Sequence, residues 1–163
     1  MNEAASTGGD PNEAAAWVAY SQSKGYGVTY WELGNEIYNN NWNGLGSGEL
    51  DLHASLTPET YAANYLAFQA AMRAQDPTIL LGATLYPDTG QASAFAGWNA
   101  RFLATIKALG GTLDCAILHW YPQFNTAVTD PYLLTIGVSF LATAIALVQG
   151  EIVLSLIHIS EPT

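Results

Sequence analysis

The chain has 163 residues, half of them hydrophobic and 11% charged, whereas an ordinary globular domain is about a quarter charged. This composition excludes intrinsic disorder, which needs low hydrophobicity and many charges. Lysine and arginine number 4 against 14 acidic residues, so the net charge is −10. This balance excludes a nucleic-acid groove and a polybasic membrane patch, because both need clustered basic residues.

Cys115 is the single cysteine, so an internal disulfide and a thiolate metal cluster are both excluded. Residues 1–9 contain no basic segment followed by an apolar one, so they do not resemble a signal peptide. The cellular location is therefore left open by these residues.

The first predicted element is a helix from Pro11 to about Lys24, with Asp10 as its N-cap. A strand is predicted over residues 28–33, whose sequence VTYWEL is β-branched and aromatic. A polar loop rich in asparagine and glycine follows, over about residues 39–55.

A second helix is predicted to begin at Thr57 and to end at Asp76 and Pro77. Its apolar residues recur at helical spacing and should face the core: Tyr61, Tyr65, Phe68 and Met72. Residues 79–85 are then a nearly continuous apolar run, as expected for a strand of a parallel sheet that is buried on both faces.

A third helix is predicted from a further apolar stripe: Phe95, Trp98, Phe102, Ile106 and Leu109. A third strand is predicted over residues 113–120. The last helix, over residues 132–148, carries no charge, so a membrane span has to be weighed. A polar stripe of Thr135, Ser139 and Thr143, and the lack of flanking lysine or arginine, favour a packed helix instead.

The last ten residues, LSLIHISEPT, resemble the translation of a sequencing-library adaptor. We therefore expect residues 154–163 to be a non-native tail and residues 1–153 to be the natural part of the chain. The alternative interpretation is a short buried strand from Ile152 to Ile159.

Helices and strands alternate along the chain, which predicts an α/β fold with parallel strands and helical crossovers. No glycine-rich dinucleotide or P-loop motif follows a predicted strand. A (β/α)8 barrel needs about 250 residues, so this chain would supply part of one. The pattern does not distinguish a barrel segment from an open doubly wound sheet.

Glu36 follows the first predicted strand, at the strand end where barrel enzymes carry their catalytic groups. A carboxyl group partly shielded from water by Trp31, Tyr38 and Trp42 would be suited to donate a proton near neutral pH. The alternative is a solvated glutamate at the end of a strand.

His119 and Tyr121 follow the third strand and should lie on one face, where they could hold a carboxylate by hydrogen bonds. The alternative for His119 is a structural core histidine. With His53 the only other histidine outside the tail, we predict no zinc site. Trp17 and Trp98 are expected in the core, and Trp42 is the best candidate to stack against a sugar ring.

Residues 31–38, WELGNEIY, resemble the fourth-strand motif of the clan GH-A retaining glycoside hydrolases, and most closely the α-L-arabinofuranosidases of family 51. The resemblance runs over about residues 10–124 and includes the stretch 51–53 and the strand end at 119–121. It implies strands 4 to 6 of a (β/α)8 TIM barrel, with the possible start of strand 7, in the catalytic domain of an extracellular enzyme.

The resemblance also implies the roles of the site residues. Glu36 would be the general acid/base, and Asn35 would bind the sugar hydroxyl next to the anomeric carbon. Trp42, His119 and Tyr121 would bind the carbohydrate substrate, with Tyr121 steadying the nucleophile. No metal or organic cofactor is implied.

In this family the nucleophile is a second glutamate at the end of strand 7. The nearest acid here is Glu161, which lies in the adaptor-like tail and which we take as a coincidence. We therefore expect the chain to be inactive alone. The alternatives are a non-catalytic carbohydrate-binding barrel, another activity of the clan such as xylosidase or endoglucanase, and an unrelated α/β enzyme.

Overall fold

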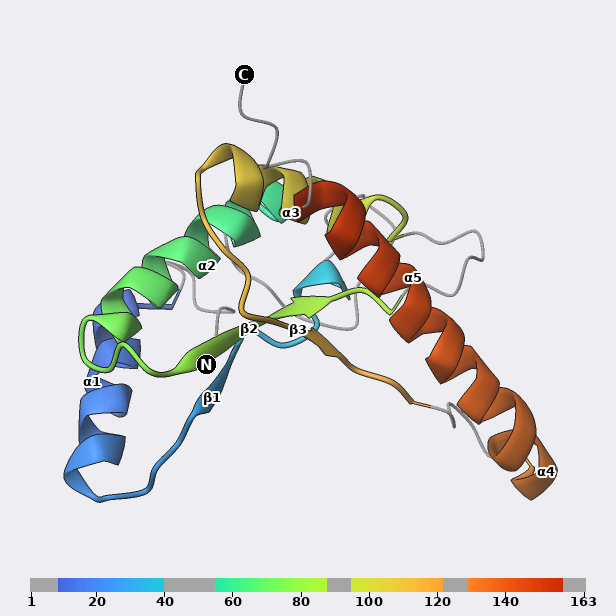
Figure 1. The fold of residues 1–163 in the computed structure, drawn as a ribbon, viewed down its shortest axis with the longest axis horizontal. Coiled ribbons are helices and arrows are strands. Elements are labelled where there is room, and N and C mark those ends of the chain that lie inside the picture. The colour runs from blue at the N-terminus through green and yellow to red at the C-terminus, as the bar shows by residue number, and fades with distance from the viewer. Residues whose placement is uncertain (1–8, 40–54, 88–94, 122–128, 157–163) are drawn as a thin grey trace.

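The computed structural model describes residues 9–39, 55–87, 95–121 and 129–156. These residues form one parallel sheet and a set of helices (Figure 1). The elements, in chain order, are α1 (Pro11–Ser23), β1 (Tyr30–Leu33), the 3-10 turn η1 (Ile37–Asn39), α2 (Pro58–Arg73), β2 (Leu80–Leu85), α3 (Trp98–Ala108), β3 (Cys115–Leu118), α4 (Asp130–Tyr132), the π-helical segment η2 (Leu133–Gly137) and α5 (Val138–Leu156).

The sheet has the order β1-β2-β3, and both strand pairs are parallel. Tyr30 pairs with Leu80 at the start of β1, and Gly82 pairs with Cys115 at the start of β3. The predicted α/β class with parallel strands is therefore confirmed. A barrel segment and one half of an open sheet share this strand order, so the partial barrel stays a prediction.

The first two helices begin at the predicted caps. The side chain of Asp10 accepts a hydrogen bond from the backbone N–H of Asn12 at 2.8 Å. Thr57 Oγ1 accepts one from the backbone N–H of Thr60 at 3.2 Å. Each cap satisfies an N–H group that has no partner inside the helix, and each is followed by a proline in the first turn.

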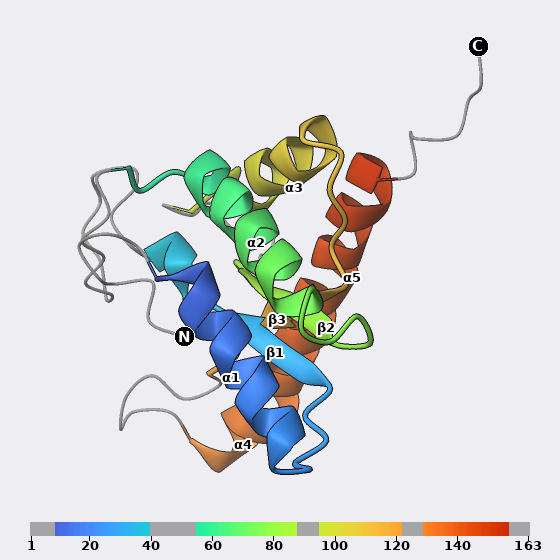
Figure 2. The ribbon, with the colours of Figure 1, turned by 90° about the vertical axis from the view of Figure 1, so that its left-hand side faces the viewer.

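The sheet has two unlike faces. The face toward the helices is apolar, with Leu33, Leu81 and Leu85 fully buried, and the predicted stripe of α2 packs in the same core. Figure 2 shows α1 and α2 in front of the sheet, with α3 beside α2 and above the strands. The far face, as we call the opposite one, carries Glu32 and Thr84, because side chains alternate along a strand.

Two tyrosines of α2 reach between neighbouring strands. The hydroxyl of Tyr61 donates to the carbonyl of Leu33 at 2.6 Å and accepts from the N–H of Thr84 at 2.9 Å, so it bridges β1 and β2 at their carboxyl ends. The hydroxyl of Tyr65 donates to the carbonyl of Leu81 at 2.9 Å. Burial raises the pKa of Tyr65, so its hydroxyl stays protonated and able to donate.

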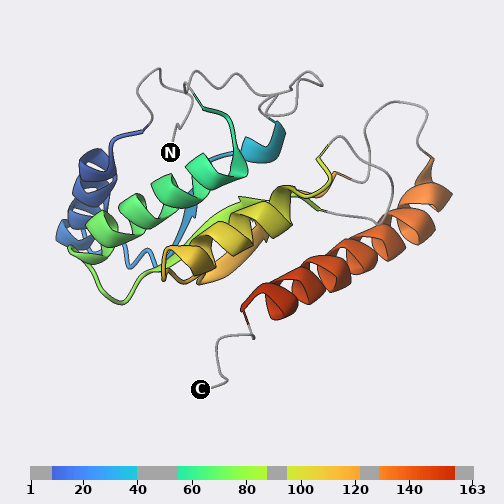
Figure 3. The same cartoon turned by 90° about the horizontal axis from the view of Figure 1, so that it is seen from above.

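The last helix continues past the end that the sequence predicts. The segments α4, η2 and α5 follow one another without a break from Asp130 to Leu156, and α5 lies beside α3 (Figure 3). Ala144 and Val148 are buried, and Ile152 packs against the core. The alternative of a strand beginning at Ile152 is wrong for residues 152–156, which are helical, because helical spacing from Val148 keeps Ile152 on the side that packs.

This helix is also long and apolar enough to cross a membrane, and it is the one such helix in the described part of the chain. The segment Asp130–Leu154 has 25 residues, and its most apolar stretch of 18 residues has a mean hydropathy of 2.0 and is 18% buried. Length and composition alone do not establish a membrane span, so the predicted absence of a membrane partner stays a prediction.

The two tryptophans expected in the core differ. Trp98 is fully buried, as predicted, whereas Trp17 is 54% exposed. The expectation for Trp17 is wrong because α1 packs against α2 through Ala14 and Val18, and Trp17 lies outside that buried stripe. Leu109, the last residue of the predicted stripe of α3, is also exposed, since the helix ends before it.

Candidate active site

Glu36 lies three residues beyond β1 in a sharply turned segment. Gly34 has a φ of 87°, and a Cβ atom there would lie 2.6 Å from Cγ1 of Ile37, so the turn needs glycine. Glu36 itself has a φ of 45°, which among the described residues is the one positive value outside glycine. A side chain costs about 1–2 kcal/mol in this left-handed conformation, so the turn imposes a local strain on Glu36.

His119 comes directly after β3 and meets Glu36 across the carboxyl end of the sheet. Its Nδ1 lies 3.2 Å from Oε1 of Glu36. The two side chains are 18% and 16% exposed, so both are largely shielded from water. Because the strands are parallel, the segments after β1 and β3 emerge at the same end of the sheet, and this brings together two residues that are 83 positions apart.

Two further residues belong to this cluster and were missed by sequence reasoning. Glu32 Oε1 lies 2.8 Å from Nε2 of His119, and Thr84 Oγ1 lies 3.4 Å from the same carboxylate oxygen. Both come from the far face of the sheet. A signal was present in the sequence: Glu32 is the charged residue between Trp31 and Leu33 in an otherwise apolar strand, and Thr84 is the polar residue of β2.

The remaining predicted site residues are exposed or lie outside the part of the chain that the structure describes. Asn35 is exposed and adjoins Glu36, and Tyr121 is 54% exposed just beyond His119. Trp42 lies outside the described residues. The expectation that Trp31 shields Glu36 from water is wrong. Its side chain lies on the helix side of β1, opposite Glu32, and packs against the core.

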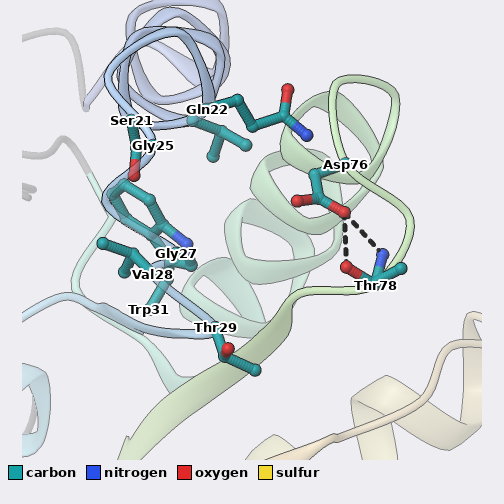
Figure 4. A pocket seen from close by; sticks show the side chains of 10 residues that line it. Ser21, Gln22, Gly25, Gly27, Val28, Thr29, Trp31, Asp76 and Thr78 are labelled. Atoms are coloured by element: carbon teal, nitrogen blue, oxygen red, sulfur yellow. Dashed lines mark hydrogen bonds between the residues drawn. The ribbon is translucent and has the colours of Figure 1, made fainter.

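A cavity of about 340 Å³ lies at the other end of the sheet (Figure 4). Its lining includes Thr29 and Thr78, which precede β1 and β2, so it opens at the amino ends of the strands. Hydrogen bonds from the hydroxyl of Thr78 at 2.6 Å and its N–H at 2.9 Å lower the pKa of Asp76. The cavity is therefore separate from the Glu36 cluster, which lies at the carboxyl ends.

The described residues of the sheet offer neither a reactive thiolate nor a set of metal ligands. Burial, and then the neighbouring Asp114 carboxylate, raise the pKa of Cys115, so little of its thiol is in the reactive thiolate form near neutral pH. In the ranges that the structure describes, no group of three histidine, cysteine or acidic side chains is arranged to hold a metal ion.

The cluster can exchange protons. A carboxyl group shielded from water and in contact with an imidazole can hold a proton or accept one. On the other side of the imidazole, Glu32 contacts Nε2 and accepts a hydrogen bond from Thr84. Compared with models of known protein families and with curated proteins, the chain matches none. The chemistry of the cluster is therefore the basis for a functional proposal.

Proposed function

We propose that the chain carries the acid/base part of a retaining glycoside hydrolase of the α-L-arabinofuranosidase type, which cleaves O-glycosidic bonds of plant polysaccharides or oligosaccharides. Its sheet would form strands 4 to 6 of a (β/α)8 barrel. The observation that carries the proposal is the contact of Glu36 with His119 at the carboxyl ends of two parallel strands. Barrel enzymes hold their reacting groups at this end.

Glu36 would act twice in the reaction. In its protonated form it gives a proton to the glycosidic oxygen as the leaving group departs, and as a carboxylate it later takes a proton from the attacking water. Asn35, exposed beside it, would hydrogen-bond the sugar hydroxyl next to the anomeric carbon. Tyr121 and Trp42 would add further contacts to the sugar.

A retaining mechanism needs a second carboxylate about 5–5.5 Å from the first. Glu32 does not suit this role, because the imidazole ring of His119 lies between its carboxylate and that of Glu36. In our proposal the nucleophile is the strand-7 glutamate of the whole barrel and not a residue of the described sheet. An unrelated α/β enzyme is less favoured, since Glu36 and His119 share one cluster.

Binding of the sugar tests the proposal directly. We expect methyl α-L-arabinofuranoside to shift the NMR signals of His119 and of the Asn35 amide saturably, with a dissociation constant on the order of 1 mM or weaker for half a site. Asn35→Ala should abolish the shifts, whereas Glu13→Gln, on the exposed side of α1, should keep them. Shifts that are absent, or that survive Asn35→Ala, would contradict the proposal.

Hydrolysis assays test whether Glu36 acts as the acid/base while a second carboxylate acts as the nucleophile. The chain alone should not release phenol from an aryl arabinofuranoside, because one of two mutually dependent carboxylates is missing. In the whole barrel, Glu36→Gln should slow cleavage of a poor leaving group by about 10²–10⁴-fold and slow an activated nitrophenyl glycoside much less, since nitrophenolate needs no proton. Turnover by the chain alone would show that the nucleophile is misassigned.

A further inference from the structure

The Glu36 cluster continues beyond the acid/base itself as a chain of hydrogen bonds across the far face. Thr84 Oγ1 donates to Glu32 Oε1 at 3.4 Å, and Glu32 Oε1 is 2.8 Å from His119 Nε2. His119 Nδ1 is in turn 3.2 Å from Glu36 Oε1. Among the described residues, His119 is the one ionisable group that either carboxylate contacts.

The number of protons that the hydrogen-bonded cluster of Glu32, His119 and Glu36 holds follows from its contacts. A neutral imidazole has one N–H donor, whereas each ring nitrogen of His119 faces a carboxylate oxygen. Two carboxylates and a neutral imidazole would leave one nitrogen lone pair facing an oxygen lone pair. Both contacts are therefore hydrogen bonds only when the cluster holds one additional proton, either on the imidazole or on a carboxyl group.

We propose that Glu32 is a positioning residue that fixes the proton of His119 at Nε2, so that the second proton of the cluster moves only between Nδ1 and Glu36. This inference rests on the proposed function and names how its acid/base is supplied with a proton. Glu32 makes the shorter of the two contacts and has a second hydrogen bond, from Thr84. A group that accepts a hydrogen bond from one imidazole nitrogen fixes the tautomer, and so decides whether the other nitrogen, which faces the reacting group, carries a proton.

The proton transfer balances between the cluster, the leaving group and the attacking water. When the second proton is on the imidazolium, its Nδ1–H donates to the Glu36 carboxylate. As that proton moves onto Glu36, the N–H bond breaks, the O–H bond forms, and the neutral imidazole keeps its Nε2–H on Glu32. Glu36 then gives this proton to the leaving group, and its carboxylate takes a proton back from the attacking water. The side chain of Glu32 is 39% exposed and that of Glu36 is 16% exposed, so the Glu32 end is the more open to water.

The other groups around the cluster do not compete for this proton. Thr84, from β2, is a neutral donor to Glu32. Cys115, at the start of β3, has a raised pKa and stays neutral near pH 7. The Arg73 guanidinium is held by Asp114 at 2.6 Å, next to the start of β3 and at the other end of the sheet. The second proton of the cluster is therefore held by His119 or by Glu36.

Nitrogen NMR of the His119 ring in the full chain tests the inference. We expect the wild-type ring to show a protonated Nε2 over the whole pH range in which the chain is folded. Glu32→Leu removes both the charge and the acceptor, so the neutral ring should become a mixture of two tautomers. Glu32→Gln keeps an acceptor and should preserve the Nε2–H tautomer.

Matched variants separate this effect from a loss of folding. Glu13→Gln removes an exposed carboxylate on α1 and should leave the His119 signals unchanged, and well-dispersed amide spectra must be retained in every variant. The inference is overturned if the tautomer of His119 is the same in Glu32→Leu as in the wild type. If the tautomer responds but arabinofuranoside shifts no signal, the glycosidase proposal fails and the role of Glu32 stands. If arabinofuranoside shifts the signals but the tautomer does not respond, the role of Glu32 fails and the glycosidase proposal stands.

Discussion

At the scale of single residues, the turn after β1 restricts the residue types that fit at positions 34 and 36. Gly34 is required by the close approach of Ile37, and Glu36 accepts a left-handed backbone that glycine or asparagine would adopt at lower cost. Strained backbone of this kind persists where the surroundings hold it. Here the carbonyl of Glu36 accepts from Asn39 at 2.7 Å, and its side chain is held by His119.

The strain at Glu36 predicts an unusual order of stabilities. Glu36→Gly and Glu36→Ala both remove the contact with His119, but only glycine relieves the positive φ of 45°. We expect the glycine variant to be more stable than the alanine variant by about 1 kcal/mol. Urea unfolding of the two variants measures the difference, with Glu36→Asn as a further variant that tolerates the left-handed region. An alanine variant as stable as the glycine variant would argue against strain at this position.

At the scale of elements, α2 stabilises the sheet with hydroxyl groups as well as with apolar area. Tyr61 bridges β1 and β2, and Tyr65 bonds the carbonyl of Leu81. The carboxylate of Asp114 adds a third bridge: it accepts from the N–H of Leu81 at 2.9 Å and from Arg73 at 2.6 Å. These bonds satisfy backbone groups in the sheet that would otherwise lack partners.

Removing one hydroxyl should therefore destabilise the fold by more than its size suggests. Tyr61→Phe leaves the carbonyl of Leu33 and the N–H of Thr84 buried without this partner, which should lower the free energy of unfolding by about 1–3 kcal/mol. Tyr20→Phe, at a position that is 48% exposed, is the matched control and should change it little. Equal stabilities of the two variants in urea would contradict the bridging role.

The ion pair between α2 and α3 gives a pH-dependent contribution. Arg101 donates to both oxygens of Glu59, at 2.7 and 2.8 Å, and these hydrogen bonds lower the pKa of Glu59 from its usual 4.5. A lowered folded-state pKa stabilises the protein above pH 4.5, and this contribution is lost as the pH falls through the lowered value. Because both side chains are over 40% exposed, a double-mutant cycle with Glu59→Gln and Arg101→Met should give about 0.2–1 kcal/mol at pH 7. The same cycle at pH 3 should give a smaller coupling, and an undiminished value there would contradict the assignment.

At the scale of the whole molecule, local signals predicted most of the fold. Caps at Asp10 and Thr57, the stripe of α2 and the apolar run of β2 each specify their element, and strict alternation specifies the parallel sheet. The continuation of α5 past Val148 and the exposure of Trp17 depend on which helix packs beside which, and neither sequence pattern contains that information. At the site, Glu36 and His119 followed from strand ends, whereas Glu32 required knowing which face of β1 the histidine reaches.

The exposed surface of the last helix and the acidic composition together govern solubility. Leu134 is 78% exposed and Val138 is 63% exposed, so η2 and α5 present apolar surface to water. At neutral pH a net charge of −10 keeps molecules apart, and this repulsion vanishes near the isoelectric point of about 4.3.

We therefore expect turbidity, measured by light scattering across pH 3–8, to be greatest near pH 4.3, where the net charge approaches zero. The double substitution Leu134→Gln and Val138→Gln leaves the net charge unchanged and removes exposed apolar groups, so it should lower the maximum without moving it along the pH axis. Tyr30→Gln, which removes a 69% exposed ring from β1 at the edge of the sheet, is the matched control. If Tyr30→Gln lowers the turbidity and the pair of substitutions in the helix does not, the edge of the sheet and not the last helix is the surface through which the molecules associate.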